Sequence, residues 1–328
     1  MNQDPQVRLG PRALARSLAC FSSWTLGARG ALAVLTFLAL VAGPVQRAHA
    51  DKLYFAGALW PIGRANLDGT ELQLSDFSPY YASGLALDPA GGRAYWVEAY
   101  SVYSMKLDLT GTKQVVFTFR TNPSTGLAFD AATSRFYWGD DFGIWSRSLS
   151  SPFLQRVVRG HPVYGGDVEL DSVHGKLYWV ETSGYVNRVN LDGTGLETLP
   201  LTGLLGNYAG LYLDTMQGKL YWADPAGTIF RANLDGSNQE PLFQIDGGII
   251  SDVAVDSAHG KIYWTDAHTS RVMRANLDGS DREDLFASYA TRLAILVPEP
   301  SSFVLAALGL IGLAASGWRK RRSGSNSA

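Results

Sequence analysis

Tyr263-Trp264-Thr265-Asp266 is one of six copies of a four-residue pattern that organises the chain. The copies begin at Tyr54, Tyr95, Tyr137, Tyr178, Tyr221 and Tyr263. Successive tyrosines are therefore 41, 42, 41, 43 and 42 residues apart. A fixed period near forty residues is typical of propellers and other repeat folds, so we predict a repeat protein.

Each repeat is predicted to form four short strands without any helical period. In the last copy these strands are expected at 253–255, 261–266, 271–276 and 282–286. Tyr263 and Trp264 are adjacent, so in a strand they point to opposite faces of the sheet. Large aromatic side chains on both faces indicate a sheet packed between two neighbours, as propeller blades are. The Asp266 carboxylate is expected to accept backbone N–H groups that the end of the strand leaves unpaired.

Two further motifs recur in register with the tetrad. Gly-Leu-Ala-(Leu/Phe)-Asp occurs at 84–88 and 126–130, and Asn-Leu-Asp-Gly occurs at 66–69, 190–193, 233–236 and 276–279. Together the three motifs resemble low-density-lipoprotein-receptor class B repeats over about residues 51–297. The resemblance implies an all-β fold, a six-bladed β-propeller of four-stranded antiparallel blades.

Two copies depart from the repeat, and the ring needs a closing strand. Gly57 stands where the first tetrad should have a carboxylate, and Ser148-Leu149-Ser150-Ser151 replaces Asn-Leu-Asp-Gly in the third repeat. We expect those two blades to be less regular.

The chain enters at Lys52 in a second strand, whereas 292–296 repeats the first-strand pattern. We predict that these segments pair in one blade, because a closed ring has no exposed sheet edges.

Residues 1–50 are predicted to be a signal peptide. Arginines precede an apolar core at 31–42, and Ala48 and Ala50 have the spacing of a cleavage site. The single cysteine, Cys20, lies in this segment. The mature protein is therefore expected to have no disulfide and no thiol chemistry.

Residues 298–328 are predicted to be a sorting tail. Pro298, Glu299 and Pro300 precede an apolar run at 303–318 and a basic cluster at 319–322. This order resembles a PEP-CTERM tail, which implies export by a Gram-negative bacterium and removal of the tail by an exosortase-type enzyme. The expected location is a transient inner-membrane anchor, then the cell surface or extracellular matrix, with the tail as the only membrane contact. The alternative is a plain tail anchor.

The charge of the repeat region argues against one class of partner. Of 28 Lys and Arg and 30 Asp and Glu, nine cations and two anions lie outside 51–297. The repeat region keeps 19 cations and 28 anions, a net charge of −9. Such a surface repels phosphate backbones, so nucleic acid is not an expected partner.

The first strands of the repeats have similar sequences, but at a few positions one repeat differs from the others. We expect functional residues at these positions. Asp167, Glu169, Asp252 and Arg292 replace residues that are Gly or Ala in other repeats, and we expect them near one mouth of the central channel. One interpretation is a structural Asp252–Arg292 pair, and the other is a site for a cation or polar ligand.

The repeated carboxylates are expected to cap turns rather than to form a metal ring: Asp88, Asp130, Asp171, Asp214 and Asp256. His174 and His259 occupy equivalent turns and are interpreted as turn residues.

The loops between second and third strands, and those leading to the next blade, are rich in aromatic residues. Candidate ligand-binding residues on them are Tyr80, Tyr81, Tyr100, Phe142, Tyr164, Tyr185, Tyr208 and Tyr289. Aromatic side chains on loops of a rigid scaffold are used to bind proteins and carbohydrates, although some simply pack the loops down.

No catalytic motif is present, and no cofactor is predicted. We therefore predict an exported module that binds a protein or polysaccharide. The alternative is a metal-dependent, lactonase-like hydrolase with its site at the channel mouth.

Overall fold

A computed structural model describes residues 51–57, 60–77, 81–119, 123–163, 166–201 and 210–296. The predicted signal peptide and sorting tail lie outside these ranges, as do Tyr80, Tyr164 and Tyr208. Within the described ranges, no helix is long and apolar enough to cross a membrane.

The described strands form six four-stranded antiparallel sheets, here called blades 1 to 6. Blade 1 contains β24 (Ala290–Leu296), β1 (Lys52–Gly57), β2 (Trp60–Asn66) and β3 (Gln73–Leu74). Blade 2 contains β4 (Ala82–Asp88), β5 (Arg93–Glu98), β6 (Ser101–Lys106) and β7 (Gln114–Thr118). Blade 3 contains β8 (Pro123–Asp130), β9 (Arg135–Asp140), β10 (Gly143–Ser148) and β11 (Gln155–Arg159).

The second half of the ring has the same plan. Blade 4 contains β12 (Val168–Asp171), β13 (Lys176–Val180), β14 (Val186–Asn190) and β15 (Glu197–Thr198). Blade 5 contains β16 (Leu211–Asp214), β17 (Lys219–Ala223), β18 (Thr228–Asn233) and β19 (Glu240–Gln244). Blade 6 contains β20 (Ile250–Asp256), β21 (Lys261–Asp266), β22 (Arg271–Asn276) and β23 (Glu283–Ala287).

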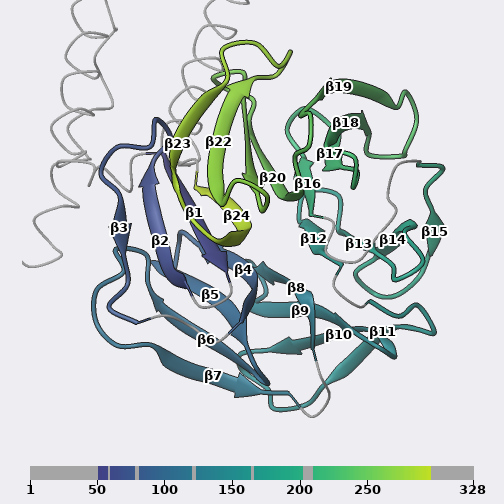
Figure 1. The fold of residues 1–328 in the computed structure, drawn as a ribbon. Coiled ribbons are helices and arrows are strands. Elements are labelled where there is room, and N and C mark those ends of the chain that lie inside the picture. The colour runs from purple at the N-terminus through teal and green to yellow at the C-terminus, as the bar shows by residue number, and fades with distance from the viewer. Residues whose placement is uncertain are drawn as a thin grey trace, which may run out of the picture. The chain divides into compact units, whose positions relative to one another are not determined.

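The blades are arranged in a closed ring. Their first strands, β24, β4, β8, β12, β16 and β20, contact one another in cyclic order around the centre (Figure 1). Strand β24 pairs with β1 from Lys52 opposite Leu296 to Gly57 opposite Ala290. The predicted closure is therefore confirmed: a strand from the end of the propeller completes the blade with which it begins. The Arg274 guanidinium of blade 6 also donates a 2.8 Å hydrogen bond to the Leu67 carbonyl of blade 1.

The tetrad joins each blade to the next. In every core cluster, a tetrad tyrosine of one blade packs with the tetrad tryptophan of the next, except that Tyr263 of blade 6 meets Phe55 of blade 1. The other five pairs are Tyr54 with Trp96, Tyr95 with Trp138, Tyr137 with Trp179, Tyr178 with Trp222 and Tyr221 with Trp264. All five tryptophans are at most 2% exposed. The predicted packing of each sheet between two neighbours is confirmed.

The two departures from the repeat have local explanations. A Cβ atom on Gly57 would lie 2.2 Å from the Tyr289 carbonyl oxygen, so glycine allows the chain to approach closely before β24. In blade 3 the Ser148 hydroxyl accepts a hydrogen bond from the Ser150 N–H at 3.2 Å, and the Ser148 carbonyl accepts one from the Ser151 N–H at 3.3 Å. Serine thus replaces the usual turn motif, and blade 3 keeps four strands of five to eight residues.

Candidate functional site

Two of the symmetry-breaking carboxylates connect neighbouring blades. The Asp167 carboxylate accepts the N–H of Val168 at 2.9 Å and, more weakly, that of Leu211 in blade 5 at 3.4 Å. The Asp252 carboxylate accepts the N–H of Val253 at 2.9 Å and that of Leu293 in blade 1 at 2.8 Å. Each aspartate therefore joins its own first strand to that of the next blade. Asp252 holds the closing strand in this way.

The glycines at equivalent positions leave room for these aspartates. A Cβ atom on Gly210 would lie 2.0 Å from Asp252 Oδ1, so no larger residue fits there without a shift. Asp167, Asp252 and Arg292 are 6%, 3% and 3% exposed. The sequence predicts these residues near a channel mouth. In the structure they are buried, at or next to the first strands β12, β20 and β24, and we call this set of three residues the ionic layer. Whether Asp252 pairs directly with Arg292 remains a prediction, although Arg292 acts electrostatically on its carboxyl group.

The carboxyl groups of this region are hard to ionise. Burial, with a smaller contribution from the repulsion of Asp167, raises the pKa of Asp252 to about 8, and Arg292 opposes the rise. Burial also raises the pKa of Asp167, again against the effect of Arg292. The pKa of Glu169 is raised well above its usual value, first by burial and then by Asp167 and Asp252. Burial in a medium of low dielectric disfavours the charged form of each group.

We expect Asp252→Asn to change how stability depends on pH. The carboxyl group has a usual pKa of 3.8 and a folded-state pKa of about 8, so between these values the folded protein binds more protons than the unfolded chain. Its stabilising contribution is present below about pH 4 and is lost as the pH rises through about 8. Urea unfolding across this range should show the wild type losing several kcal/mol relative to the variant, at about 1.4 kcal/mol per pKa unit. A difference that stays constant or grows with pH would contradict this assignment.

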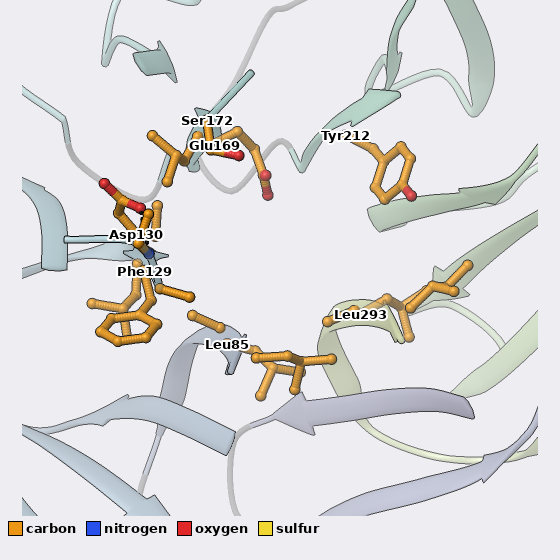
Figure 2. Close-up of a pocket in the computed structure, with 16 residues that line it drawn as sticks. Leu85, Phe129, Asp130, Glu169, Ser172, Tyr212 and Leu293 are labelled. Carbon is orange, nitrogen blue, oxygen red and sulfur yellow. Dashed lines mark hydrogen bonds between the residues drawn. The ribbon is translucent and has the colours of Figure 1, made fainter. Parts of the chain in front are cut away.

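A cavity of about 500 Å³ lies in the channel beside the ionic layer. Its walls are mainly aliphatic, and its polar side chains include Glu169 and Tyr212 (Figure 2). The Glu169 carboxylate projects into the open space, and Tyr212 lies on the next blade. Neither side chain has a hydrogen-bond partner among the described residues. Tyr212 was not chosen from the sequence as a site residue, although an aromatic where four other inner strands have alanine was the available signal.

The cavity opens at the turns between first and second strands. Its rim includes the exposed residues Ala131, Ala132 and Ser172. The aspartates predicted to cap these turns do so, with backbone N–H groups 2.8–3.2 Å from Asp88, Asp130, Asp171, Asp214 and Asp256. The Nδ1 atoms of His174 and His259 lie 2.7 and 2.6 Å from the turn carboxylates, which confirms both as turn residues. In the described part of the chain, no group of three or more His, Cys, Asp or Glu residues is arranged to hold a metal ion.

The opposite end of the propeller carries most of the exposed aromatic residues of the described chain. We call it the loop face: the loops between second and third strands and those entering the next blade. Five of the eight predicted binding residues are described, and each is more than half exposed: Tyr81 56%, Tyr100 57%, Phe142 54%, Tyr185 56% and Tyr289 61%. Because the first strands run from the loop face to the cavity rim, the two surfaces lie at opposite ends of the propeller.

Comparisons with known proteins agree with this architecture. The model of the low-density lipoprotein receptor repeat class B matches residues 260–294, and that of the PEP-CTERM protein-sorting motif matches residues 296–322. A chain from the structure titled "Crystal structure of Nidogen/Laminin Complex" is similar with a TM-score of 0.66 and 21% identity, over 76% of this chain and 99% of that one. TolB from Acinetobacter baumannii is similar with a TM-score of 0.60 and 14% identity, over 75% of this chain and 66% of TolB.

The two sequence motifs and the closed ring describe one molecule. The class B match covers β21, β22 and β23 of blade 6 and most of β24, the strand that closes the ring. The sorting motif begins at the last residue of that strand and indicates export and sorting to the cell surface. The described strands thus form a six-bladed propeller that contains a match to the low-density lipoprotein receptor repeat class B at residues 260–294 and is followed by a PEP-CTERM sorting motif.

Proposed function

We propose that the propeller is a binding module that recognises an extracellular protein through its loop face. The observation that carries this proposal is the distribution of exposed aromatic side chains. Six are found among the exposed large hydrophobic residues of the described chain, and five of them lie on the loop face. Aromatic residues are over-represented among the side chains that dominate protein interfaces.

The backbone beneath these aromatic residues is held in place. The Tyr100 carbonyl accepts the Phe119 N–H at 2.7 Å, and the Tyr185 carbonyl accepts the Glu181 N–H at 2.7 Å. The Phe142 N–H donates to the tetrad carboxylate of Asp140 at 2.8 Å. Such anchoring lowers the entropy lost when a partner binds. The tetrad carboxylate of Asp266 likewise accepts the His268 N–H at 3.0 Å, as was predicted for carboxylates at the end of this strand.

A protein partner is favoured over a polysaccharide by one comparison. The similar chain of the nidogen/laminin structure belongs to a complex between proteins, as its title states. A metal-dependent, lactonase-like activity would instead need the carboxylates of the channel as ligands. Asp167 and Asp252 already accept backbone N–H groups, which supports a structural role for both.

Alanine substitution on the loop face should weaken binding. Fragment 51–297 contains every strand of the ring and can be screened against arrays of extracellular proteins and polysaccharides. For the partner found, we expect Tyr100→Ala and Tyr185→Ala each to raise Kd about tenfold or more, as loss of an interface hot spot does. Because both rings are exposed, the melting temperature should not change.

Phe153→Ala is the matched control, because Phe153 is 81% exposed but lies between β10 and β11, away from the loop face. Its Kd should equal that of the wild type. Equal losses in all three variants, or none in the tyrosine variants, would refute the loop face as the binding surface. If the partner found is a polysaccharide and the variants show the same pattern, the loop face is the binding surface but its ligand is a polysaccharide rather than a protein.

A further inference from the structure

The channel contains more acidic groups than basic ones. Asp167, Glu169 and Asp252 act on one another electrostatically, and among the described residues Arg292 is the cation that acts on all three. The facing positions of blades 2 and 3 add no charge, since they are Gly84, Ala86, Gly126 and Ala128. Full ionisation would leave two uncompensated negative charges out of bulk water, which is costly. A bound cation would offset one of these charges and so favour ionisation of a carboxyl group that burial otherwise keeps protonated.

Glu169 is the member of this group that can meet such a cation. The carboxylates of Asp167 and Asp252 accept backbone N–H groups, whereas Glu169 lines the cavity and projects into it (Figure 2). The Glu169 carboxylate has no hydrogen-bond partner in the described ranges. The ring of Tyr212 beside the same space adds a surface on which an organic cation can be held by cation–π attraction.

The rest of the cavity suits an apolar body rather than a bare ion. Leu85, Leu127, Leu170, Leu293 and Ile295 are among the residues that form its walls. A volume of about 500 Å³ is within the range of pockets that bind small molecules. A metal ion would need several oxygen ligands at short range, and Glu169 alone does not provide them.

We propose that this cavity binds an organic ammonium ion with an apolar body, whose charged group pairs with Glu169. The protonated Glu169 carboxyl loses its proton to solvent as the ammonium ion enters, and the carboxylate and ammonium then form an ion pair. Aliphatic walls replace water around the body of the ligand, which adds favourable burial. This site is separate from the loop face, so it gives the propeller a second ligand.

The test uses three probes of similar shape with fragment 51–297: hexylammonium, 1-hexanol and hexanoate. By isothermal titration calorimetry near neutral pH, we expect hexylammonium to bind at least tenfold more tightly than 1-hexanol, and hexanoate not to bind. Glu169→Gln should reduce hexylammonium binding to the level of 1-hexanol. Equal binding of hexylammonium and 1-hexanol, no binding of hexylammonium, or full binding by Glu169→Gln would overturn the proposal.

A second pair of variants locates the site. Ala294 lines the cavity and is partly exposed, so Ala294→Leu should narrow the cavity and weaken hexylammonium binding, with little change in the melting temperature. Tyr100→Ala, at the loop face, should bind hexylammonium like the wild type. If Ala294→Leu binds the probe as tightly as the wild type, the ammonium ion binds elsewhere and the inference is wrong. Because each site has its own variants, failure of one proposal is distinguishable from failure of the other.

Discussion

A propeller fragment that ends at residue 289 is expected to lose its folded structure. The missing strand β24 pairs with β1 and packs against β4 and β20. It buries Leu293 and Leu296, and burial of one leucine contributes about 1.5–3 kcal/mol. It also provides the Leu293 N–H that Asp252 accepts. Since whole domains are stable by only about 5–15 kcal/mol, loss of these interactions is comparable with the total stability.

The matched control is fragment 51–297, which lacks the tail and keeps β24. Circular dichroism, thermal melting and size-exclusion chromatography should show a cooperative monomer for the longer fragment. The shorter one should be unfolded or aggregated, because β1 and the inner face of blade 1 become exposed edges. A synthetic peptide of residues 290–297 should restore the melting transition. Equal melting temperatures for both fragments would show that closure does not hold the ring together.

The ring could be predicted from the sequence because its determinants repeat. The tetrad fixes the number of blades by its period, and the adjacent Tyr263 and Trp264 fix packing on both faces. The closing strand was predictable for the same reason, since 292–296 repeats a pattern that otherwise begins each blade. The period and the alternation within a strand determine the first two features, and the repeat pattern itself identifies the partner of the long-range contact between β1 and β24.

The candidate sites could be predicted only in part, because they depend on contacts between repeats. Alignment of the repeats shows that Asp252 and Gly210 are equivalent, but not that a Cβ on Gly210 would lie 2.0 Å from the Asp252 carboxylate. It also does not show that Asp167 and Asp252 are buried while Glu169 faces a cavity. These distances and exposures depend on how the neighbouring blades approach one another, which the sequence of a single repeat does not determine.

Substitution of one tetrad tryptophan should be among the most damaging single changes. Trp222 is fully buried between blades 4 and 5, where it packs with Tyr178 and Leu199. Its ring stacks on Phe230 with centroids 5.5 Å apart. Trp222→Ala would leave a large cavity between two blades, and we expect it to lower the free energy of unfolding by about 3–5 kcal/mol, as for large aromatic residues in other cores.

Trp222→Phe provides the informative comparison, because the molecule itself uses Phe55 at the equivalent position of blade 1. The Trp222 Nε1 atom has no hydrogen-bond acceptor among the described residues. Replacement by phenylalanine therefore breaks no hydrogen bond of the side chain and removes only part of its packing contacts. We therefore expect a loss of about 1–2 kcal/mol for phenylalanine, well below that for alanine. Trp96→Phe should cost more than Trp222→Phe, because Trp96 Nε1 donates to Glu98 at 3.4 Å. Urea unfolding of the four proteins, including the wild type, gives the order directly. If Trp222→Ala were no worse than Trp222→Phe, the ring would not depend on aromatic packing between blades.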